Sequence, residues 1–361
     1  MTALKNEISP ELVVSLGSEI GRAWADFPAR QWQRQATDGL DSLELMERVD
    51  HLAQILGRCL PAGFTSAAAI LNRTLDSPTF TGWMTLPCGV FVSEAGIDEP
   101  ETALPLLAAL SPRFSSESPM RVFIEKHPDL TFEYLRRWVD DPDDHVRRLV
   151  SECTRPRLPW ARRLNDLMAD PSPSIALLDR LFDDESAYVR QSVANHLNDI
   201  AKDHPELAIE CAKRWLAASN HGNRVARHGL RTLIKHGNAE ALAVLGYDQS
   251  VEVTLDSLTI KPDRIAIGDV VKIEAVLRAA ASTRVAMDYL VHHQGARGLL
   301  APKVFKLTSR TIEADTPCRV TKNHRFRHLS IRTIHPGTHR IELQVNGHVL
   351  GGQDIEILID T

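Results

Sequence analysis

The sequence predicts a mainly α-helical solenoid followed by a small all-β sandwich. Three observations lead to this fold class. In residues 1–246, apolar side chains recur three and four positions apart, as they do on one face of an amphipathic helix. Blocks of sequence return within this segment at the spacing of stacked helix pairs. After Gly246 the pattern changes to short β-branched runs separated by proline and glycine.

The helical segment, residues 1–246, is expected to form the first domain. Its apolar period is clear in one stretch where six residues share a helical face: Leu45, Met46, Val49, Leu52, Ile55 and Leu56. The alternation of β-branched and aromatic residues that would indicate strands is absent from this segment. All six tryptophans of the chain lie in it, at positions 24, 32, 83, 138, 160 and 215.

The helical segment repeats itself. The block His127-Pro128-Asp129-Leu130 returns 77 positions later as His204-Pro205-Glu206-Leu207, and Val146-Arg147 returns 43 positions later as Val189-Arg190. Helix pairs of HEAT and armadillo repeats take about 40–47 residues, so the longer offset holds about two such units. We therefore expect a HEAT-like solenoid, whose stacked helix pairs form a concave surface.

Two acidic runs precede predicted helices. Residues 141–144 read Asp-Pro-Asp-Asp, and residues 183–186 read Asp-Asp-Glu-Ser. These residue types accept hydrogen bonds from the free N–H groups of a first helical turn, and their charge complements the positive end of the helix dipole. We expect them to cap the helices that follow and to have no part in catalysis.

Residues 247–361 are expected to form the second domain. Five short runs of alternating or β-branched residues predict its strands: Val251–Ile260, Val270–Leu277, Val285–Val291, Lys303–Leu307 and Ile341–Val345. A segment of about a hundred residues with strands at this spacing is typical of an immunoglobulin-like sandwich.

The net charge of −5 hides strongly basic stretches. His145–Arg163 holds six arginines against one acid, and Lys213–His236 holds six basic residues, three histidines and no acid. A single run of this kind is usually a solvated helix face, but two runs at matching places of a repeat favour a groove that binds phosphates. The candidate phosphate contacts are Arg147, Arg148, Arg155, Arg157, Arg190, Arg227, Arg231 and Lys235.

Other features argue against several classes of protein. The five cysteines are scattered and form no Cys-x-x-Cys pair, which argues against a zinc knuckle or a disulfide framework. No apolar stretch approaches the ~20 residues that cross a bilayer, and the amino terminus shows no basic patch followed by an apolar run. We expect a monomer located in the cytoplasm, without a metal site or cofactor.

Three blocks of the helical segment resemble one known family. The first runs from Ser151 to Trp160 and reads Ser-Glu-Cys-Thr-Arg-Pro-Arg-Leu-Pro-Trp, the second covers Tyr188–Pro205, and the third covers Arg227–Lys235. Together they are similar to the AlkC group of the HEAT-like DNA alkylation repair glycosylases, within the AlkC/AlkD superfamily. The resemblance covers about residues 1–246, and a subset of AlkC proteins carries an immunoglobulin-like domain after that point.

The resemblance implies a monofunctional DNA glycosylase that excises cationic alkylated bases, 3-methyladenine and 3-methylcytosine, from duplex DNA without base flipping. Its partner is then double-stranded DNA with alkylated bases. In the related AlkD group a tryptophan and an aspartate stand close together in sequence, whereas here Trp160 stands alone. The carboxylates must therefore come from other helices. The β domain is expected to contact DNA through its most basic run, which holds Arg319, Lys322, Arg325 and Arg327.

Four residues are candidates for catalysis: Glu117, Glu152, Trp160 and Asp199. A base methylated at N3 already carries a positive charge, so its departure needs no general acid. The transition state needs negative charge beside an oxocarbenium-like sugar and a positioned water, and carboxylates can supply both. We expect the three acids, which come from successive repeats, to meet in the groove. There Trp160 would offer an aromatic face to the cationic base or the sugar.

Structural roles compete with the assignments of the first two acids. Glu152 can pair with Arg148 or Arg155, which is the commoner fate of an acid near arginines. Glu117 stands in a predicted first helical turn, where a carboxylate complements the helix dipole.

Asp199 and Trp160 also have structural alternatives. Asp199 can anchor Lys202 or His196, and Trp160, which follows Pro159, can wedge two helices apart. If the candidates point into separate cores, the alternative function is a non-catalytic HEAT-repeat scaffold that binds DNA or protein partners.

Overall fold

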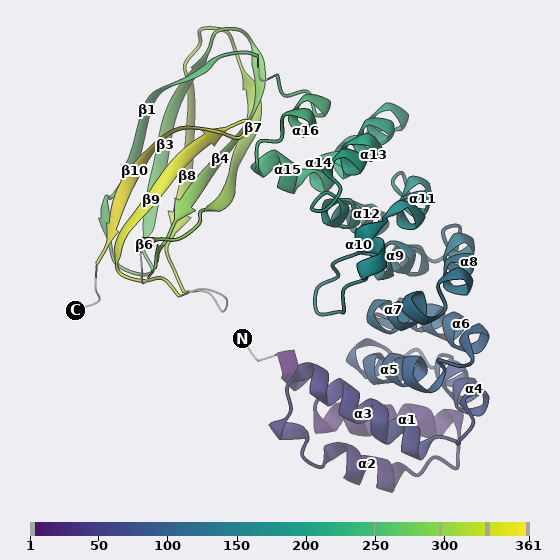
Figure 1. Ribbon diagram of the computed structural model, residues 1–361. Helices are drawn as coiled ribbons and strands as arrows, with labels where there is room; N and C mark the ends of the chain where they lie inside the picture. The colour runs from purple at the N-terminus through teal and green to yellow at the C-terminus, as the bar shows by residue number, and fades with distance from the viewer. Residues whose placement is uncertain (1–3, 249, 296–297, 329–332, 359–361) are drawn as a thin grey trace. The chain divides into compact units, whose positions relative to one another are not determined.

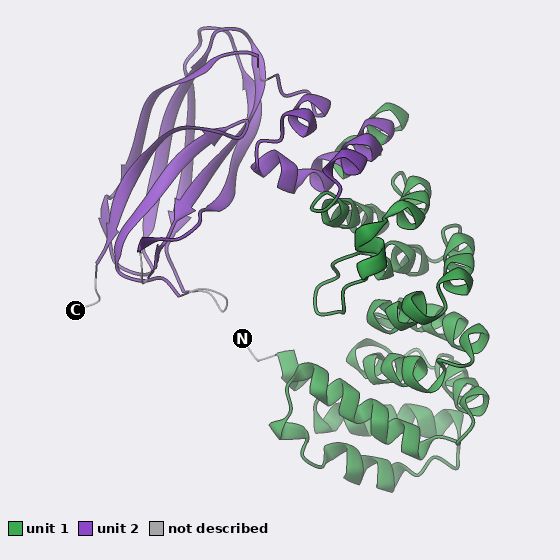
Figure 2. Ribbon diagram, in the orientation of Figure 1, with its two compact units in different colours: residues 1–203, 215–225 green, residues 204–214, 226–361 purple. Residues whose placement is uncertain are grey.

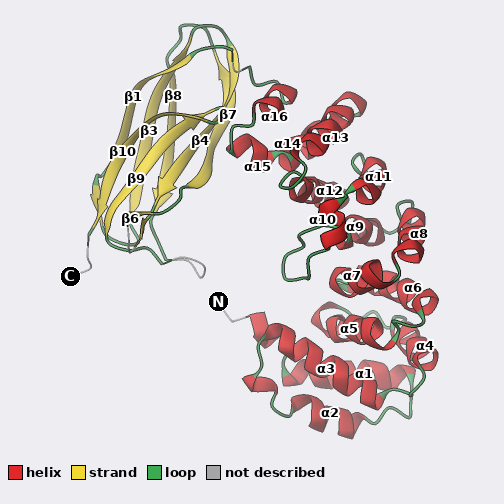
Figure 3. Ribbon diagram, viewed as in Figure 1, coloured by secondary structure: helices red, strands yellow, loops and turns green. Residues whose placement is uncertain are grey.

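The computed structural model describes residues 4–248, 250–295, 298–328 and 333–358. Helices come first in the chain and strands follow (Figure 3). The chain divides into two compact units, shown in different colours in Figure 2. Unit 1 comprises residues 1–203 and 215–225, and unit 2 comprises residues 204–214 and 226–361. Within the described ranges, no helix is both long and apolar enough to cross a membrane.

Unit 1 is a stack of helices in two rows (Figure 1). In the first row each helix contacts the next: α3 (Leu45–Cys59), α5 (Thr85–Ala95), α7 (Glu117–Lys126), α9 (Asp144–Cys153) and α12 (Ala187–Ile200). The second row holds α4 (Phe64–Thr74), α6 (Pro100–Leu110), α8 (Pro128–Trp138) and α11 (Ser172–Leu181).

The remaining helices of the stack lie at its start and between these rows: α1 (Pro10–Ala23), α2 (Ala29–Thr37), α10 (Asn165–Ala169) and the short 3-10 turns η1 (Leu4–Glu7), η2 (Leu40–Ser42), η3 (Gly82–Met84) and η4 (Ser111–Arg113). Two further helices, α13 (Pro205–Ala218) and α14 (Asn220–Gly229), contribute residues to both units.

The predicted caps of α9 and α12 are confirmed. The Asp143 carboxylate accepts a hydrogen bond from the backbone N of His145 at 2.8 Å. Ser186 Oγ accepts one from the backbone N of Tyr188 at 3.2 Å. Both bonds satisfy N–H groups that have no partner inside their helix. The acidic runs at 141–144 and 183–186 therefore fix where these two helices of the first row begin.

Unit 2 contains a sandwich of two sheets. A three-stranded sheet has the order β1-β3-β8, and a five-stranded sheet has the order β2-β10-β9-β4-β7. All the pairings are antiparallel except that of β2 with β10. The strands are β1 (Val253–Lys261), β2 (Arg264–Ile265), β3 (Val270–Ala279), β4 (Thr283–His292), β7 (Lys303–Ile312), β8 (Cys318–Arg325), β9 (Gly337–Val345) and β10 (His348–Ile357), with a small hairpin of β5 (Gln294–Gly295) and β6 (Gly298–Leu299).

The predicted order of a helical domain and an all-β sandwich is confirmed. The five predicted strands overlap β1, β3, β4, β7 and β9, whereas β8 and β10 were not predicted. Two buried clusters fill the space between the sheets, one around Ile273 and Val291 and the other around Leu277 and Val285. The sandwich thus has the apolar inner faces expected of an immunoglobulin-like domain.

Unit 2 also holds two short helices, α15 (Arg231–Lys235) and α16 (Ala239–Val244). The end of α15 contacts the five-stranded sheet. Gln344 Nε2 on β9 donates to the Lys235 carbonyl at 2.9 Å, and Tyr247 is 2 % exposed. The change from helix to strand falls between Val244 and Val253, but the compact unit that holds the sandwich begins earlier in the chain. The domain boundary at residues 246/247 stays a prediction.

Candidate active site on three neighbouring helices

The three candidate acids stand on three successive helices of the first row: α7, α9 and α12 (Figure 1). Glu117 is the first residue of α7, where Ser115 Oγ donates to its carboxylate. Glu152 lies one residue before the end of α9, and Asp199 one residue before the end of α12. We call Glu117, Glu152 and Asp199 the acid cluster.

Arg148 links the first two acids. Its guanidinium forms an ion pair with Glu117 and places Nη2 3.8 Å from Glu152 Oε1. Arg148 and Glu152 are four residues apart on α9, so their side chains lie on the same face. The guanidinium also lies over the Tyr188 ring, with its central carbon 4.9 Å from the ring centroid. Tyr188 is 42 % exposed, so this contact lies at the surface.

Arg155 links the second and third acids. Its Nη1 donates to Glu152 Oε1 at 2.6 Å, and its Nε donates to Asp199 Oδ2 at 2.8 Å. Burial disfavours the charged guanidinium, but attraction from the two carboxylates outweighs it and raises the pKa of Arg155. Lys202 Nζ completes the chain of contacts at 2.9 Å from Asp199 Oδ1.

The acid cluster is nearly closed and formally neutral. Glu117, Glu152 and Asp199 are 3 %, 6 % and 2 % exposed. Their three negative charges are matched by three cations, because Arg148, Arg155 and Lys202 each pair with at least one of them. The chain of contacts reaches solvent at two places, since the Arg148 and Lys202 side chains are 18 % and 40 % exposed. A ligand therefore meets these two cations before it meets the acids.

Polar groups of α9 and α12 hold the middle of the acid cluster. Ser192 Oγ donates to Glu152 Oε2 at 2.5 Å. His196 Nδ1 lies 2.9 Å from the Ser151 carbonyl, the residue before Glu152. Burial lowers the pKa of His196 to about 4, so its ring is neutral at pH 7 and Nδ1 can donate to that carbonyl.

Trp160 lies at the surface, and the prediction that it can wedge helices apart is wrong. It is 80 % exposed and stands in the loop between α9 and α10, at a backbone φ of 62°. A bulky residue rarely adopts this left-handed conformation. We call residues 154–164 the Trp160 loop. Its Arg155 enters the acid cluster, while Trp160 presents its indole to solvent.

Comparisons with known proteins find relatives of both the helical and the β part of the chain. Residues 115–236 match the model of the DNA alkylation repair enzyme family, and residues 254–359 match the model of the immunoglobulin-like C-terminal domain of the uncharacterised protein YhaZ. The solved structure of the alkylpurine DNA glycosylase AlkC from Pseudomonas fluorescens, bound to DNA containing an abasic site analogue, is 32 % identical. The match covers 99 % of this chain and 100 % of that one, with a TM-score of 0.91.

The chain belongs to the AlkC group of the DNA alkylation repair glycosylases. A curated relative from Bacillus subtilis, the uncharacterised protein YhaZ, is 32 % identical over 358 residues, which is 99 % of this chain and all of that protein. The family resemblance read from the sequence is confirmed, and so is the immunoglobulin-like domain after the helical repeats. The family-model match on the helical side contains the whole acid cluster.

Two arginines of this AlkC-group chain are structural, which corrects their assignment as phosphate contacts. Arg147 is 7 % exposed, donates to both Asp184 carboxylate oxygens at 2.7 and 3.0 Å, and also donates to the carbonyls of Asp141 and Pro142. Arg155 is 8 % exposed and bound to the acid cluster. Neither guanidinium is free to meet a phosphate in this structure.

The other predicted phosphate contacts of unit 1 differ in how far their side chains are exposed to solvent. Arg190 donates to the carbonyls of Asp184 and Glu185, which repeats the pattern of the arginine 43 positions before it. Arg157 pairs with Asp203 at 2.7 Å, but its side chain is 25 % exposed. Arg148 is partly exposed at the edge of the acid cluster. Arg148 and Arg157 stay the best predicted phosphate contacts of this unit.

The remaining predicted contacts belong to unit 2. Arg227 donates to the Tyr247 hydroxyl at 2.5 Å, and Arg231 donates to the His228 carbonyl at 2.6 Å. Lys235 lies close enough to Asp288 for their charges to interact. Each is half-buried, so a phosphate-binding role for these residues stays a prediction.

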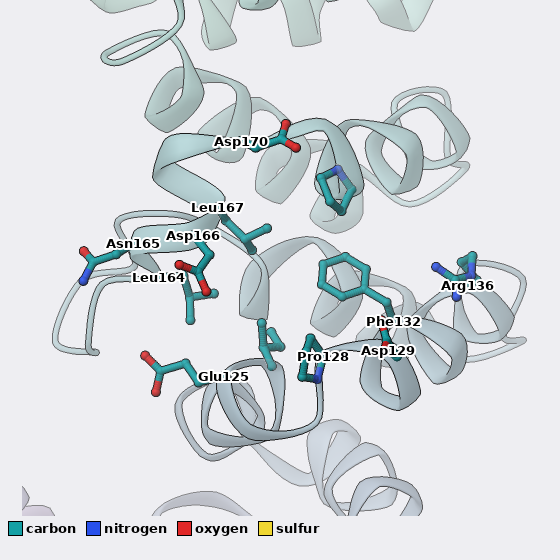
Figure 4. A pocket seen from close by; sticks show the side chains of 12 residues that line it. Glu125, Pro128, Asp129, Phe132, Arg136, Leu164, Asn165, Asp166, Leu167 and Asp170 are labelled. Carbon is teal, nitrogen blue, oxygen red and sulfur yellow. The ribbon is translucent and has the colours of Figure 1, made fainter.

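The sequence did not single out two residues that the structure places beside the site. Tyr188 supports Arg148, and Arg121 on α7 is fully buried beneath the Trp160 loop. Both residues lie on helices of the first row, Arg121 on α7 and Tyr188 on α12. A single tyrosine or arginine in a helix does not indicate a functional role from sequence alone. Figure 4 shows a cavity of about 540 Å³ that Phe132 and Leu164 help to line, and none of the three acids lines it.

Proposed function

We propose that this protein is a monofunctional DNA glycosylase that releases cationic alkylated bases, 3-methyladenine and 3-methylcytosine, from duplex DNA. The observation that carries this proposal is the acid cluster, in which three helices of the family-matched region bring three carboxylates into one chain of contacts. Acids that pointed into separate cores would have favoured a scaffold. The known relative supports the reaction class, since it is an alkylpurine DNA glycosylase.

Because the base already carries a positive charge, the reaction needs no general acid from the protein. The glycosidic bond of an N3-methylated base breaks heterolytically: both bonding electrons leave with the base, which becomes neutral, and the sugar develops positive charge. A water molecule attacks the sugar at C1′ and loses a proton. Carboxylates stabilise the oxocarbenium-like sugar and accept a hydrogen bond from that water, much as they do in glycoside hydrolysis.

Duplex DNA exposes the carboxylates of the acid cluster by attracting the cations that cover them. Phosphates attract Arg148 and Lys202, the two cations of the cluster that reach solvent. When these side chains turn toward phosphate, the three carboxylates face only Arg155, and the cluster gains net negative charge beside the sugar. Glu152 and Asp199, which share Arg155, are then positioned to act on the sugar and the water.

Trp160 acts on the lesion from the surface. An exposed indole on a loop can stack on a cationic base or cover the sugar without a pocket that encloses the base. This placement supports excision without base flipping. The β domain adds affinity through phosphate contacts from the exposed basic residues of β8, Arg319, Lys322 and Arg325.

A release assay tests the proposed function. Full-length protein is incubated with duplex DNA treated with a methylating agent, and free bases are measured by chromatography and mass spectrometry. We expect release of 3-methyladenine and 3-methylcytosine, with abasic sites formed in equal amount and no strand cleavage. A protein that binds the methylated duplex and releases neither base would be a scaffold, and the glycosylase proposal would be abandoned.

A further inference from the structure

Arg121 is a fully buried arginine that binds only backbone. It lies one helical turn after Glu117 on α7 and is 0 % exposed. Its Nη1 donates to the carbonyls of Cys153 at 2.8 Å and Arg155 at 2.6 Å, and its Nε donates to the carbonyl of Arg162 at 2.9 Å. Its Nη2 also donates to the Arg162 carbonyl. Among the described residues, all hydrogen-bond acceptors of this guanidinium are carbonyl oxygens.

These carbonyls lie on both sides of Trp160. Cys153 and Arg155 precede it at the end of α9, and Arg162 follows it before α10. A single side chain from a third helix thus ties the two ends of the Trp160 loop together. Within the loop, backbone bonds join Leu164 N to Pro156 O at 3.2 Å and Ala161 N to Leu158 O at 3.3 Å.

The conformation of Trp160 needs such a constraint. A non-glycine residue at positive φ is strained and persists only where the surrounding structure enforces it. The exposed indole cannot supply that constraint, because 80 % of Trp160 is open to solvent. The buried contacts at the base of the loop are the ones that can.

Arg155 joins the same contacts to the acid cluster. Its carbonyl accepts a hydrogen bond from Arg121, while its own side chain binds Glu152 and Asp199. A shift of the loop therefore moves the indole of Trp160 and the guanidinium between two acids at once.

Arginine suits this place better than lysine. Its planar fork carries five N–H donors and can reach three carbonyls at fixed angles, whereas an ammonium has three donors on one nitrogen. The Cys153 carbonyl is at the negative end of the α9 dipole, which favours a cation there. Burial lowers the pKa of Arg121 to about 10, so it stays protonated at pH 7.

We propose that Arg121 is a positioning residue of the glycosylase site: it fixes the Trp160 loop, and through it Trp160 and Arg155, against the acid cluster. This inference rests on the proposed function, since the site it positions is the proposed active site. Its structural part, the restraint of the loop, is measurable without any excision.

The test compares Arg121→Lys and Arg121→Met with a matched control, Glu125→Gln. Glu125 contacts the same end of the loop through an ion pair with the Arg162 side chain at 2.6 Å, and it is one of the residues that line the cavity in Figure 4. That pair is largely exposed, so its loss changes little. Three quantities are measured on full-length protein: the tryptic cleavage rate after Arg157 within the loop, affinity for methylated duplex DNA, and the single-turnover excision rate.

We expect faster cleavage after Arg157 and slower excision in both Arg121 variants. A loop displaced by about 1 Å loses on the order of 100-fold in rate. Affinity should change by less than about threefold, because only one of the accessible predicted phosphate contacts, Arg157, lies in the loop. Arg121→Lys, which keeps the charge and part of the donor set, should lose less than Arg121→Met. The Glu125→Gln control should match the original protein in all three quantities.

Two outcomes would overturn the proposal: an Arg121 variant with wild-type loop protection, or one with a freed loop and unchanged excision. If Arg121→Met does not fold, the lysine variant decides by the same criteria. Failure of the original protein to excise any base would remove the proposed function and the positioning role with it. The cleavage rates would then still report separately whether Arg121 restrains the loop.

Discussion

Each carboxylate of the acid cluster pairs with an arginine or a lysine. An ionised carboxylate buried without a partner costs several kcal/mol, whereas a paired and hydrogen-bonded one is tolerated. Glu152 has the fullest set of partners, with Arg155 and Ser192 at hydrogen-bond distance and Arg148 at 3.8 Å. This pairing also masks the acids. In the proposed function, the phosphates of bound DNA draw Arg148 and Lys202 away from them.

His196 predicts a loss of stability in acid. Its pKa is about 4 in the folded protein and about 6.5 in the unfolded chain. The unfolded chain therefore binds a proton first as the pH falls. The free energy of unfolding is highest above pH 6.5 and decreases between about pH 6.5 and pH 4. The loss amounts to roughly 3 kcal/mol for a shift of this size. Urea unfolding at several pH values measures it.

His196→Asn is the matched variant for this measurement. The asparagine amide can take the place of Nδ1 as donor to the Ser151 carbonyl, but it does not titrate. The neighbouring charges of Asp199, Glu152 and Arg155 are present in both proteins. The variant should show a shallower loss of unfolding free energy below pH 6.5, and equal slopes would contradict the assignment.

Because Trp160 is exposed, we expect that replacing it lowers activity without lowering stability. Its side chain is exposed and its φ of 62° suits glycine. Trp160→Gly should keep or slightly raise the midpoint of thermal unfolding. Loss of the aromatic face should slow single-turnover excision about 2- to 30-fold, the range of a cation–π contact. A variant that loses stability, or one that excises at the original rate, would contradict this role.

At the scale of elements, the repeated arginines of α9 and α12 explain why Arg147 was wrongly predicted to bind phosphate. Arg147 and Arg190 each donate Nη1 to the two carbonyls five and six residues before them. Both arginines were predicted phosphate contacts, but this repeated arrangement binds each of them to backbone at the start of its own helix. Sequence could not reveal this, because Asp184, the carboxylate partner of Arg147, comes from the neighbouring repeat.

The two long strands missed from the sequence, β8 and β10, have physical explanations. In β8 only Val320 is fully buried, because the strand pairs on one side alone, with β3. Its exposed charges gave no alternating apolar pattern. In β10 the pair Gly351-Gly352 resembles a break, but the strand runs through it with a register shift between Val349 and Gly351. Glycine in a strand often marks such a bulge.

A close approach of two glycines in unit 2 gives a stability prediction. A Cβ on Gly347, which has φ +86°, would lie 2.0 Å from Gly237 Cα, whereas a Cβ on Gly268, at φ +103°, meets nothing within 4 Å. Both alanine variants carry the cost of a left-handed backbone, but Gly347→Ala also overpacks the turn after α15. We expect it to lose about 1–3 kcal/mol more than Gly268→Ala in the free energy of unfolding. Equal losses would contradict this packing.

At the scale of the whole molecule, the sequence predicted the order of helical repeats and sandwich, and the family. Local periods and turn residues determine those features, so they are visible without contacts. It also named the three acids that the structure brings together, although their selection depended on the family pattern. It could not predict which arginines pair with them, because each pairing joins different helices. The predicted boundary at residues 246/247 stays a prediction, and α15 contacts the sheet of unit 2 through Lys235.

The central claim is that the carboxylates of the acid cluster promote departure of the base. The most direct measurement is single-turnover release of 3-methyladenine from methylated duplex DNA by Glu152→Gln and Asp199→Asn, with DNA affinity measured in parallel. Both variants keep the shape of the side chain and remove its charge. We predict a loss of excision of at least 100-fold or about 3 kcal/mol, with affinity unchanged or higher. Original excision rates in both variants would contradict the account.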